Sequence, residues 1–340
     1  MHKKTDFLTA RPVWIKGKET EKNVTALFVA QIGQGQMQIN ITASCIYRMF
    51  INGRLIAYGP ARGPHGYFRI DRIDLTDYCT NEKNFVAIEV AGYNVNSYYL
   101  LDQPSFLQAE ILKDGIVVAR TAKDGDFSCR IVHQRQQKVQ RYSTQRTFAE
   151  AWSVDKAYYD AYTSFPAQNE SLSEYSPFKY LERGVSFATM AESNIVQIVS
   201  SGVAQYKTDK VFDFKGRSLV CISPELKGYT EEELSFGLTE EASHLHFLRN
   251  SHGPRNVKYP EFLSGGEWIT GNFRCNLSGF IKLKVKALKK SRLTLLFDEL
   301  LQENDVNPWR MRDCCNDLDL TLDVGEYTFI SYEPSTLSGL

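Results

Sequence analysis

Hydrophobic and polar residues alternate along much of the first third of the chain, with the period of two that is typical of β-strands. Between residues 36 and 42 the apolar positions are Met37, Ile39 and Ile41. Between residues 84 and 91 they are Val86, Ile88 and Val90. Because neighbouring side chains of a strand point to opposite faces, each segment is predicted to bury one face in a core.

Two short connections between such segments have the composition of tight β-turns. Asn52-Gly53 separates the apolar stretch 46–51 from 54–58, and Asp114-Gly115 separates 106–112 from 116–120. Asn-Gly and Asp-Gly pairs tolerate the positive φ angles that two-residue hairpin turns require. Both regions are therefore predicted to be antiparallel hairpins.

The alternating pattern returns near the C-terminus. Between residues 279 and 287 the positions predicted to face inward are Ile281, Leu283 and Val285, and lysines occupy the positions between them. Segments 292–297, 318–322 and 327–332 continue this second β region. The pattern predicts an all-β protein with two antiparallel β-sandwich domains of the jelly-roll, galactose-binding-like type.

The expected domain organisation has three parts. Residues 1–165 form the N-terminal β-sandwich, and residues 166–261 form a connecting region with short strands and a short helix. Residues 262–340 form the second β-sandwich, which is expected to be truncated at its C-terminus. The boundary near residue 165 rests on the pair Phe165-Pro166, which follows an aromatic and polar stretch.

Composition excludes several classes of function. The chain has 40 basic and 40 acidic residues and no net charge, which argues against a dedicated binder of nucleic acid or anionic membranes. No run of about 18 apolar residues predicts a membrane span. The N-terminus lacks the apolar segment of a signal peptide, so we expect a cytoplasmic protein, or a periplasmic or secreted one if a leader has been removed.

Carboxylates are concentrated in the second β region. They are Asp298, Glu299, Glu303, Asp305, Asp313 and Asp317. Glycoside hydrolysis requires two carboxyl groups roughly 5 to 9.5 Å apart, and this segment could supply them. Turn formation and solvation explain the same residues, so we expect exposed side chains with ordinary pKa values near 4 and assign no catalytic residue.

A second acidic group could bind a metal. Asp71, Asp74 and Asp77 lie in the sequence RIDRIDLTDY, and calcium takes several oxygen ligands at 2.3–2.6 Å. The alternative is that these aspartates cap the turn between two strands. No other cofactor is expected.

Five aromatic residues could stack on the faces of sugar rings. They are Tyr93, Tyr98, Tyr99, Trp152 and Trp309. The competing explanation is that each belongs to a core or an interface, because large aromatic side chains contribute strongly to both.

Three segments carry a resemblance to a known family. They are YRMFINGRLIAYGPARG with its Asn-Gly hairpin and Gly-Pro-Ala-Arg loop, IDLTDY followed by NFVAIEV, and the pair FDELLQENDVNPWRMR and LDVGEYTFISYEPSTL. In this order they resemble the β-sandwich modules that precede the catalytic domain of bacterial α-L-rhamnosidases. In that family the acid and the base lie in a C-terminal (α/α)6 barrel. Nothing in this sequence resembles that barrel, so the resemblance transfers no catalytic residue.

The resemblance implies the non-catalytic β portion of an α-L-rhamnosidase-like glycoside hydrolase. This portion would pack against the barrel of a longer parent chain and shape its cleft, and a plant or bacterial glycan with terminal rhamnose would be the substrate. The alternative is an autonomous carbohydrate-binding module that calcium could assist. A hydrolase that uses the carboxylates of residues 298–317 is a third interpretation.

Overall fold

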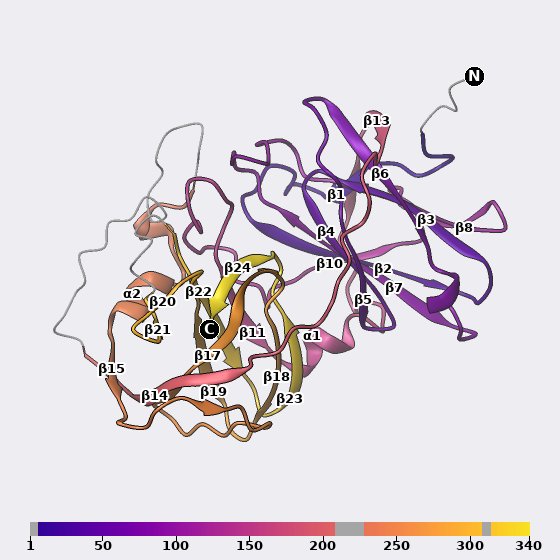
Figure 1. Ribbon diagram of the computed structural model, residues 1–340. Coiled ribbons are helices and arrows are strands. Elements are labelled where there is room, and N and C mark those ends of the chain that lie inside the picture. The colour runs from indigo at the N-terminus through magenta and orange to yellow at the C-terminus, as the bar shows by residue number, and fades with distance from the viewer. Residues whose placement is uncertain (1–5, 208–227, 308–313) are drawn as a thin grey trace. The chain divides into compact units, whose positions relative to one another are not determined.

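The computed structural model describes residues 6–207, 228–307 and 314–340 (Figure 1). The protein is nearly all β, with several antiparallel sheets, which confirms the predicted fold class. Its residues form two compact units that are interleaved in sequence: residues 1–137 and 155–188 make up the first, and residues 138–154 and 189–340 the second. None of the helices in the described ranges is long and apolar enough to cross a membrane.

In the first unit, residues 6–137 and 155–188 form two sheets. One has the order β12-β1-β8-β3-β6-β13, with β9 paired to β8. Its strands are β1 (Val13–Ile15), β3 (Met37–Ala43), β6 (Tyr67–Asp74), β8 (Leu107–Lys113), β9 (Ile116–Arg120), β12 (Leu172–Glu174) and β13 (Lys179–Glu182). The other has the order β10-β2-β7-β4-β5. Its strands are β2 (Val24–Ile32), β4 (Ile46–Ile51), β5 (Arg54–Gly59), β7 (Asn84–Gly92) and β10 (Ser128–Ile131).

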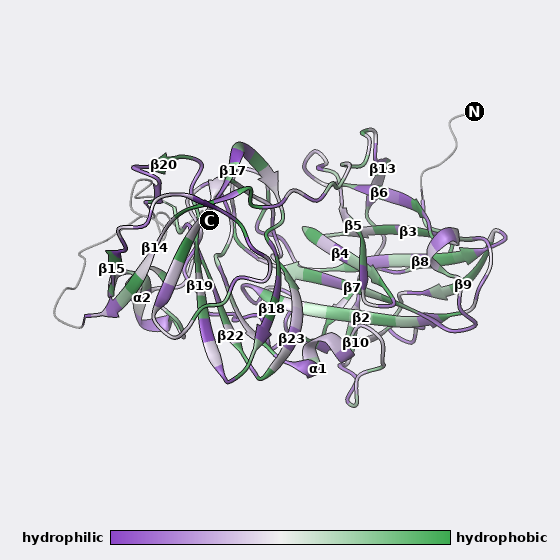
Figure 2. Ribbon diagram, turned by 60° about the horizontal axis from the view of Figure 1, so that its bottom comes forward, coloured by the Kyte–Doolittle hydropathy of each residue, from purple (hydrophilic) through white to green (hydrophobic). Residues whose placement is uncertain are grey.

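One hydrophobic core joins side chains from both of these sheets. Val86, Ile88 and Val90 are completely buried in it, as predicted. Figure 2 shows hydrophobic and hydrophilic residues alternating along the strands. Both predicted hairpins are present, and φ is +50° at Asn52 and +51° at Asp114, with a glycine at positive φ after each.

Strand β3 departs from the expected half-buried strand. Its polar residues Asn40 and Thr42 are buried, as are its apolar ones. The cause is the N-terminal segment, whose backbone amides at Leu8, Thr9 and Ala10 donate to the buried carboxylate of Glu110 on β8. Asn40 donates to the same carboxylate at 3.1 Å. A polar contact between distant segments therefore covers a face that alternation assigns to solvent.

A buried ionic network holds α1 (Lys156–Asp160) on the first unit. The guanidinium of Arg48 on β4 lies 2.5 Å from the carboxylate of Glu89 on β7. Tyr158 and Tyr162 both donate to the second oxygen of Glu89. The Asp155 side chain accepts the amide of Tyr158 at 2.7 Å and caps the helix.

The described residues of the second unit form four sheets. The first has the order β11-β22-β19, with β11 (Glu150–Val154), β19 (Ser291–Leu296) and β22 (Asp317–Leu322). The second has the order β15-β14-β17-β24, with β16 paired to β14. Its strands are β14 (Gln197–Tyr206), β15 (Leu245–Arg249), β16 (Arg255–Asn256), β17 (Glu267–Gly279) and β24 (Ser335–Gly339). The other two are a two-stranded antiparallel sheet of β18 (Lys282–Ala287) and β23 (Gly325–Ile330), and a hairpin of β20 (Leu301–Gln302) and β21 (Asp305–Val306). The described helices of this unit are α2 (Leu238–Ser243) and a 3-10 turn at Glu231–Glu233.

Burial in the second unit follows the predicted alternation only in part. Ile281 is buried, but Leu283 and Val285 are half-buried, while the lysines between them are exposed. Here a two-stranded sheet, β18–β23, replaces the broad sheet that we expected over this segment. A narrow sheet covers its inner side chains less completely.

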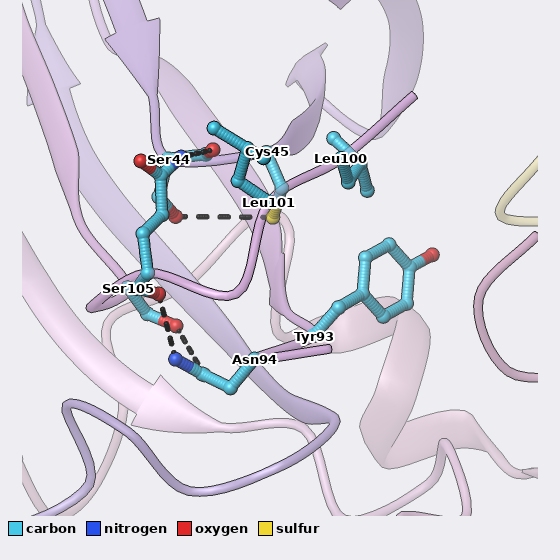
Figure 3. Close-up of a pocket in the computed structure, with 8 residues that line it drawn as sticks. Ser44, Cys45, Tyr93, Asn94, Leu100, Leu101 and Ser105 are labelled. Atoms are coloured by element: carbon cyan, nitrogen blue, oxygen red, sulfur yellow. Dashed lines mark hydrogen bonds between the residues drawn. The ribbon is translucent and has the colours of Figure 1, made fainter. Parts of the chain in front are cut away.

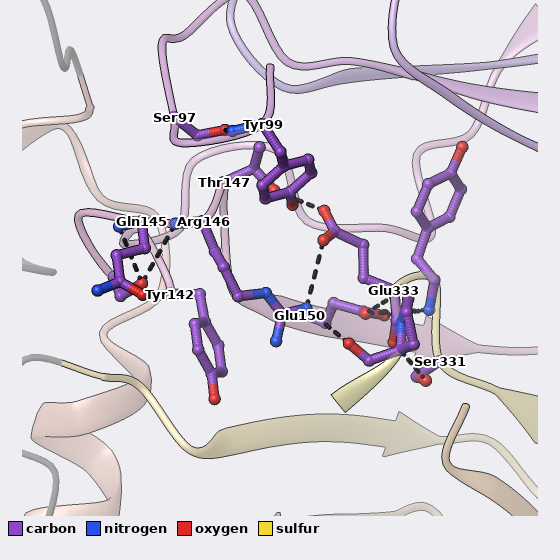
Figure 4. A network of polar contacts seen from close by, with 12 residues as sticks. Ser97, Tyr99, Tyr142, Gln145, Arg146, Thr147, Glu150, Ser331 and Glu333 are labelled. Atoms are coloured by element: carbon purple, nitrogen blue, oxygen red, sulfur yellow. Dashed lines mark hydrogen bonds and ion pairs between the residues drawn. The ribbon is translucent and has the colours of Figure 1, made fainter. Parts of the chain in front are cut away.

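Polar side chains hold the C-terminal segment of this unit in place (Figure 4). The carboxylate of Glu150 accepts the backbone amides of Tyr332 and Glu333 and the indole N–H of Trp152. Glu333 in turn accepts a hydrogen bond from the Thr147 hydroxyl at 2.5 Å. Trp152 packs edge-on against Phe329, with ring centroids 5.7 Å apart.

Candidate ligand-binding loop in the first unit

The loop from Tyr93 to Ser105 follows β7 and is braced by its own polar side chains (Figure 3). Asn94, at φ +49°, donates its side-chain amide to the carbonyl of Gln103 at 2.7 Å. The Ser105 hydroxyl donates to the Asn94 side-chain oxygen at 2.8 Å. A small pocket opens beside this brace, and Ser44 and Cys45 line its other side. The base of the loop is therefore fixed.

The tip of the loop is also held by local hydrogen bonds. The Ser97 hydroxyl accepts the amides of Tyr99 and Leu100, and the first of these bonds is visible in Figure 4. Such side-chain turns replace the missing backbone pairs of an irregular segment. The braced tip leaves Tyr98 73% exposed and Leu101 39% exposed.

A second loop, formed by residues 59–66, meets the first at a cation–π contact. The guanidinium carbon of Arg62 lies 4.8 Å from the centroid of the Tyr99 ring, and Arg62 is exposed. This contact places a positive charge, a half-buried aromatic ring and the exposed ring of Tyr98 on the same pair of loops. Aromatic faces with nearby hydrogen-bond donors are a common arrangement at polar ligand sites.

The carboxylate of Asp71 holds the second loop. It accepts hydrogen bonds from the Tyr47 hydroxyl at 2.6 Å and from the Arg183 guanidinium at 2.7 Å. Burial raises the pKa of Asp71, and the hydrogen bonds from Tyr47 and Arg183 oppose that shift. The position of Gly59 next to this carboxylate allows no side chain, because an added Cβ would lie 2.2 Å from an Asp71 oxygen.

The three calcium candidates are not assembled into a metal site. Asp71 is buried and paired with Arg183, while Asp74 and Asp77 are exposed. Asp74 accepts the amide of Thr76, and hydrogen bonds from Thr76 lower its pKa, as expected for a turn-capping residue. Within the described ranges no group of three or more potential metal ligands occurs. Calcium binding by these residues stays a prediction.

The five aromatic candidates occupy different environments. Tyr93 is buried beneath the loop, with the Arg135 guanidinium 5.5 Å from its ring centroid. Trp152 is buried in the second unit. Trp309 lies outside the described residues. Tyr98 and Tyr99 therefore remain as sugar-facing candidates, together with Arg62, which the sequence interpretation overlooked although it ends the Gly-Pro-Ala-Arg motif.

The expected exposure of the acidic segment is wrong for two of its members. Asp298 and Asp317 are buried. Burial, reinforced by repulsion from Asp319, raises the pKa of Asp317 well above its ordinary value. The reason is that Asp317 begins β22, which pairs between β11 and β19, so it belongs to a sheet and not to a loop. Asp305 is half-buried, while Asp313 lies outside the described residues.

Comparison with solved structures finds similar folds in α-L-rhamnosidases. A GH78 rhamnosidase of Bacillus sp. GL1 matches with a TM-score of 0.68 and 13% identity, over 98% of this chain and 53% of that chain. The enzyme from Aspergillus terreus matches with a TM-score of 0.53 and 13% identity, over 98% of this chain and 34% of that one. The enzyme from Dictyoglumus thermophilum matches with a TM-score of 0.52 and 11% identity, over 97% and 33%.

The chain has the fold of part of these rhamnosidases. It spans between about a third and about half of the length of the enzymes that it matches. No protein-family model matches the sequence, and no curated protein matches it. At 11–13% identity the likeness extends to the fold, and the residues that perform a function must be argued from this chain's own geometry.

Proposed function

We propose that this chain is the non-catalytic β portion of an α-L-rhamnosidase-like glycoside hydrolase. The observation that carries the proposal is the coverage of the fold match, which is 98% of this chain but 53% of the Bacillus enzyme. In such a protein the β portion packs against a catalytic barrel and shapes the approach to its cleft. The exposed loops with Tyr98 and Arg62 are the part of the first unit that we assign to contact with glycan.

Hydrolysis by the β portion alone requires a protonated acid at the leaving oxygen and a base or nucleophile on the opposite side. Asp317, whose pKa is raised, is buried in the β11-β22-β19 sheet, so we expect the purified 340-residue chain to release no nitrophenol from 4-nitrophenyl α-L-rhamnopyranoside. Turnover that is abolished by Asp298→Asn or Glu299→Gln would contradict the proposal and support a stand-alone hydrolase. The coding sequence downstream of Leu340 is the second test, because we expect an in-frame (α/α)6 barrel there.

An autonomous carbohydrate-binding module is the second candidate function. Tyr98 favours it, because a ring that is 73% exposed on a braced loop can stack on a sugar without reorganisation. Binding of methyl α-L-rhamnopyranoside to the isolated chain, lost in Tyr98→Ala and retained in Tyr67→Ala, would support this function. Tyr67 is a suitable control because it is also exposed but lies on β6.

A further inference from the structure

The β15-β14-β17-β24 sheet of the second unit carries a pair of aromatic side chains on one face. Phe247 on β15 and Trp268 on β17 meet edge to face, with ring centroids 5.6 Å apart. They meet across the central strand β14, where Ala204 pairs with Phe247 and Gly202 pairs with Trp268. Phe247 is 41% exposed and Trp268 is half-buried, so part of this aromatic surface faces solvent.

Gly202 provides the space for the indole. A Cβ at this position would lie 2.8 Å from the indole nitrogen of Trp268 and 1.9 Å from the carbonyl oxygen of Leu248. The ring of Trp268 therefore lies low over the strand, and the floor beneath the two aromatic residues consists of the small residues Gly202 and Ala204. The two rings are nearly perpendicular, at 82°, so the face of one ring and the edge of the other meet above this floor. We call Phe247, Trp268 and the floor between them the aromatic platform.

A charged pair borders the platform. Arg249 pairs with Gly202 in the sheet and is two residues from Phe247, so it shares the face of the platform. Its guanidinium donates to Asp305 at 2.7 Å, and 43% of the Arg249 side chain is exposed. The carboxylate of Asp305 also accepts hydrogen bonds from the hydroxyl groups of Ser200 and Thr270. The negative charge of Asp305 therefore compensates the positive charge of Arg249. Both side chains lie beside the aromatic residues, where they can form hydrogen bonds with a ligand.

We propose that the aromatic platform is a binding site for a neutral pyranose, independent of the loops in the first unit. The C–H face of a pyranose suits the partially negative faces of aromatic rings, and its hydroxyl groups suit a charged donor and acceptor placed beside them. The balanced charge of Arg249 and Asp305 favours a neutral ligand over an anionic one. The choice of a sugar as ligand rests on the proposed function.

The test uses the four indole N–H signals of the ¹⁵N-labelled whole chain, with the Trp268 signal assigned from Trp268→Phe. We expect methyl α-L-rhamnopyranoside or methyl α-D-glucopyranoside to shift this signal saturably, with a Kd on the order of millimolar. Phe247→Ala should weaken binding roughly fivefold or more, about 1 kcal/mol. Arg249→Gln should weaken it as well.

Leu248→Ala is the matched control, because Leu248 is 48% exposed on the same strand but points to the opposite face. It should leave the affinity unchanged. The proposal is overturned if no sugar shifts the Trp268 signal, if glycerol shifts it equally, or if Leu248→Ala loses binding as Phe247→Ala does. Binding that moves other signals and is lost in Tyr98→Ala would also overturn it, while leaving the proposed function intact.

Discussion

The Tyr47 hydroxyl donates a 2.6 Å hydrogen bond to the carboxylate of Asp71, and this bond joins the two sheets of the first unit. Tyr47 belongs to β4 and Asp71 to β6, and both side chains are buried. Burial, with the nearby negative charge of Asp71, raises the pKa of Tyr47 well above its ordinary value, so the phenol remains a donor. Gly59, at the start of the loop of residues 59–66, lies directly against both side chains.

The first prediction concerns the close contact beneath this loop. Gly59→Ala should destabilise the protein by about 2–4 kcal/mol, because the new methyl group would overlap Asp71 and Tyr47 in a packed environment. Urea unfolding measures the change. Gly253→Ala is the control, since no atom lies within 4 Å of the added Cβ there, and equal losses in the two variants would contradict the explanation.

The second prediction concerns the buried ion pair of Arg48 and Glu89. Arg48→Met should cost about 3–5 kcal/mol, because it leaves the Glu89 carboxylate buried without its cation. Lys156→Met removes an exposed ion pair with Asp160 and should change the unfolding free energy little. A loss in Arg48→Met no larger than that in Lys156→Met would show that the pair contributes no more than a surface contact.

The third prediction concerns pH. The raised pKa of Asp317 means that the folded state holds this proton at pH values where the unfolded chain has released it. Its contribution to stability is therefore present below the unfolded pKa and is lost as pH rises through the folded pKa. The charged groups that face Asp317 are Asp319 and Arg292, and Arg292 also pairs with Glu241 of α2.

Asp317→Asn should remove this part of the pH dependence, because the amide cannot ionise. Thermal unfolding of both proteins across the range from pH 4 to neutral measures the difference. We expect the gain in Tm of the variant over the wild type to grow as pH rises. A constant difference across the series would mean that the Asp317 carboxyl does not titrate in the expected direction.

The fourth prediction concerns the N-terminal segment. Glu110→Ala should release residues 8–10, because their backbone amides lose the buried carboxylate that accepts them. Hydrogen exchange at these amides should accelerate, whereas exchange in the β2–β7 pair should change less. Glu82→Ala, at an exposed position, serves as the control. Unchanged protection at residues 8–10 in Glu110→Ala would show that other contacts hold the segment.

The sequence by itself determined the local structure of this protein. Period-two alternation identified the buried face around Ile88, and the Asn52-Gly53 pair identified a hairpin, because each depends on residues that are neighbours along the chain. The order of the three quoted motifs also indicated the rhamnosidase-like fold that the structural comparison supports. Hairpins and turn types follow from short-range rules, whereas the parallel pairs β11–β22 and β6–β13 join segments that are far apart in the sequence.

Only the tertiary structure decided which polar residues are buried and which partners they contact. Asp71 and Asp74 are three residues apart, yet one is buried against Arg183 and the other is exposed. Asp317 is buried because two strands from distant parts of the chain pair on either side of it. Phe247 and Trp268 meet because β14 lies between their strands and has a glycine at the crossing point. The burial and the partners of a polar or aromatic side chain depend on segments that are distant in the sequence. The residues next to it in the chain therefore do not predict them.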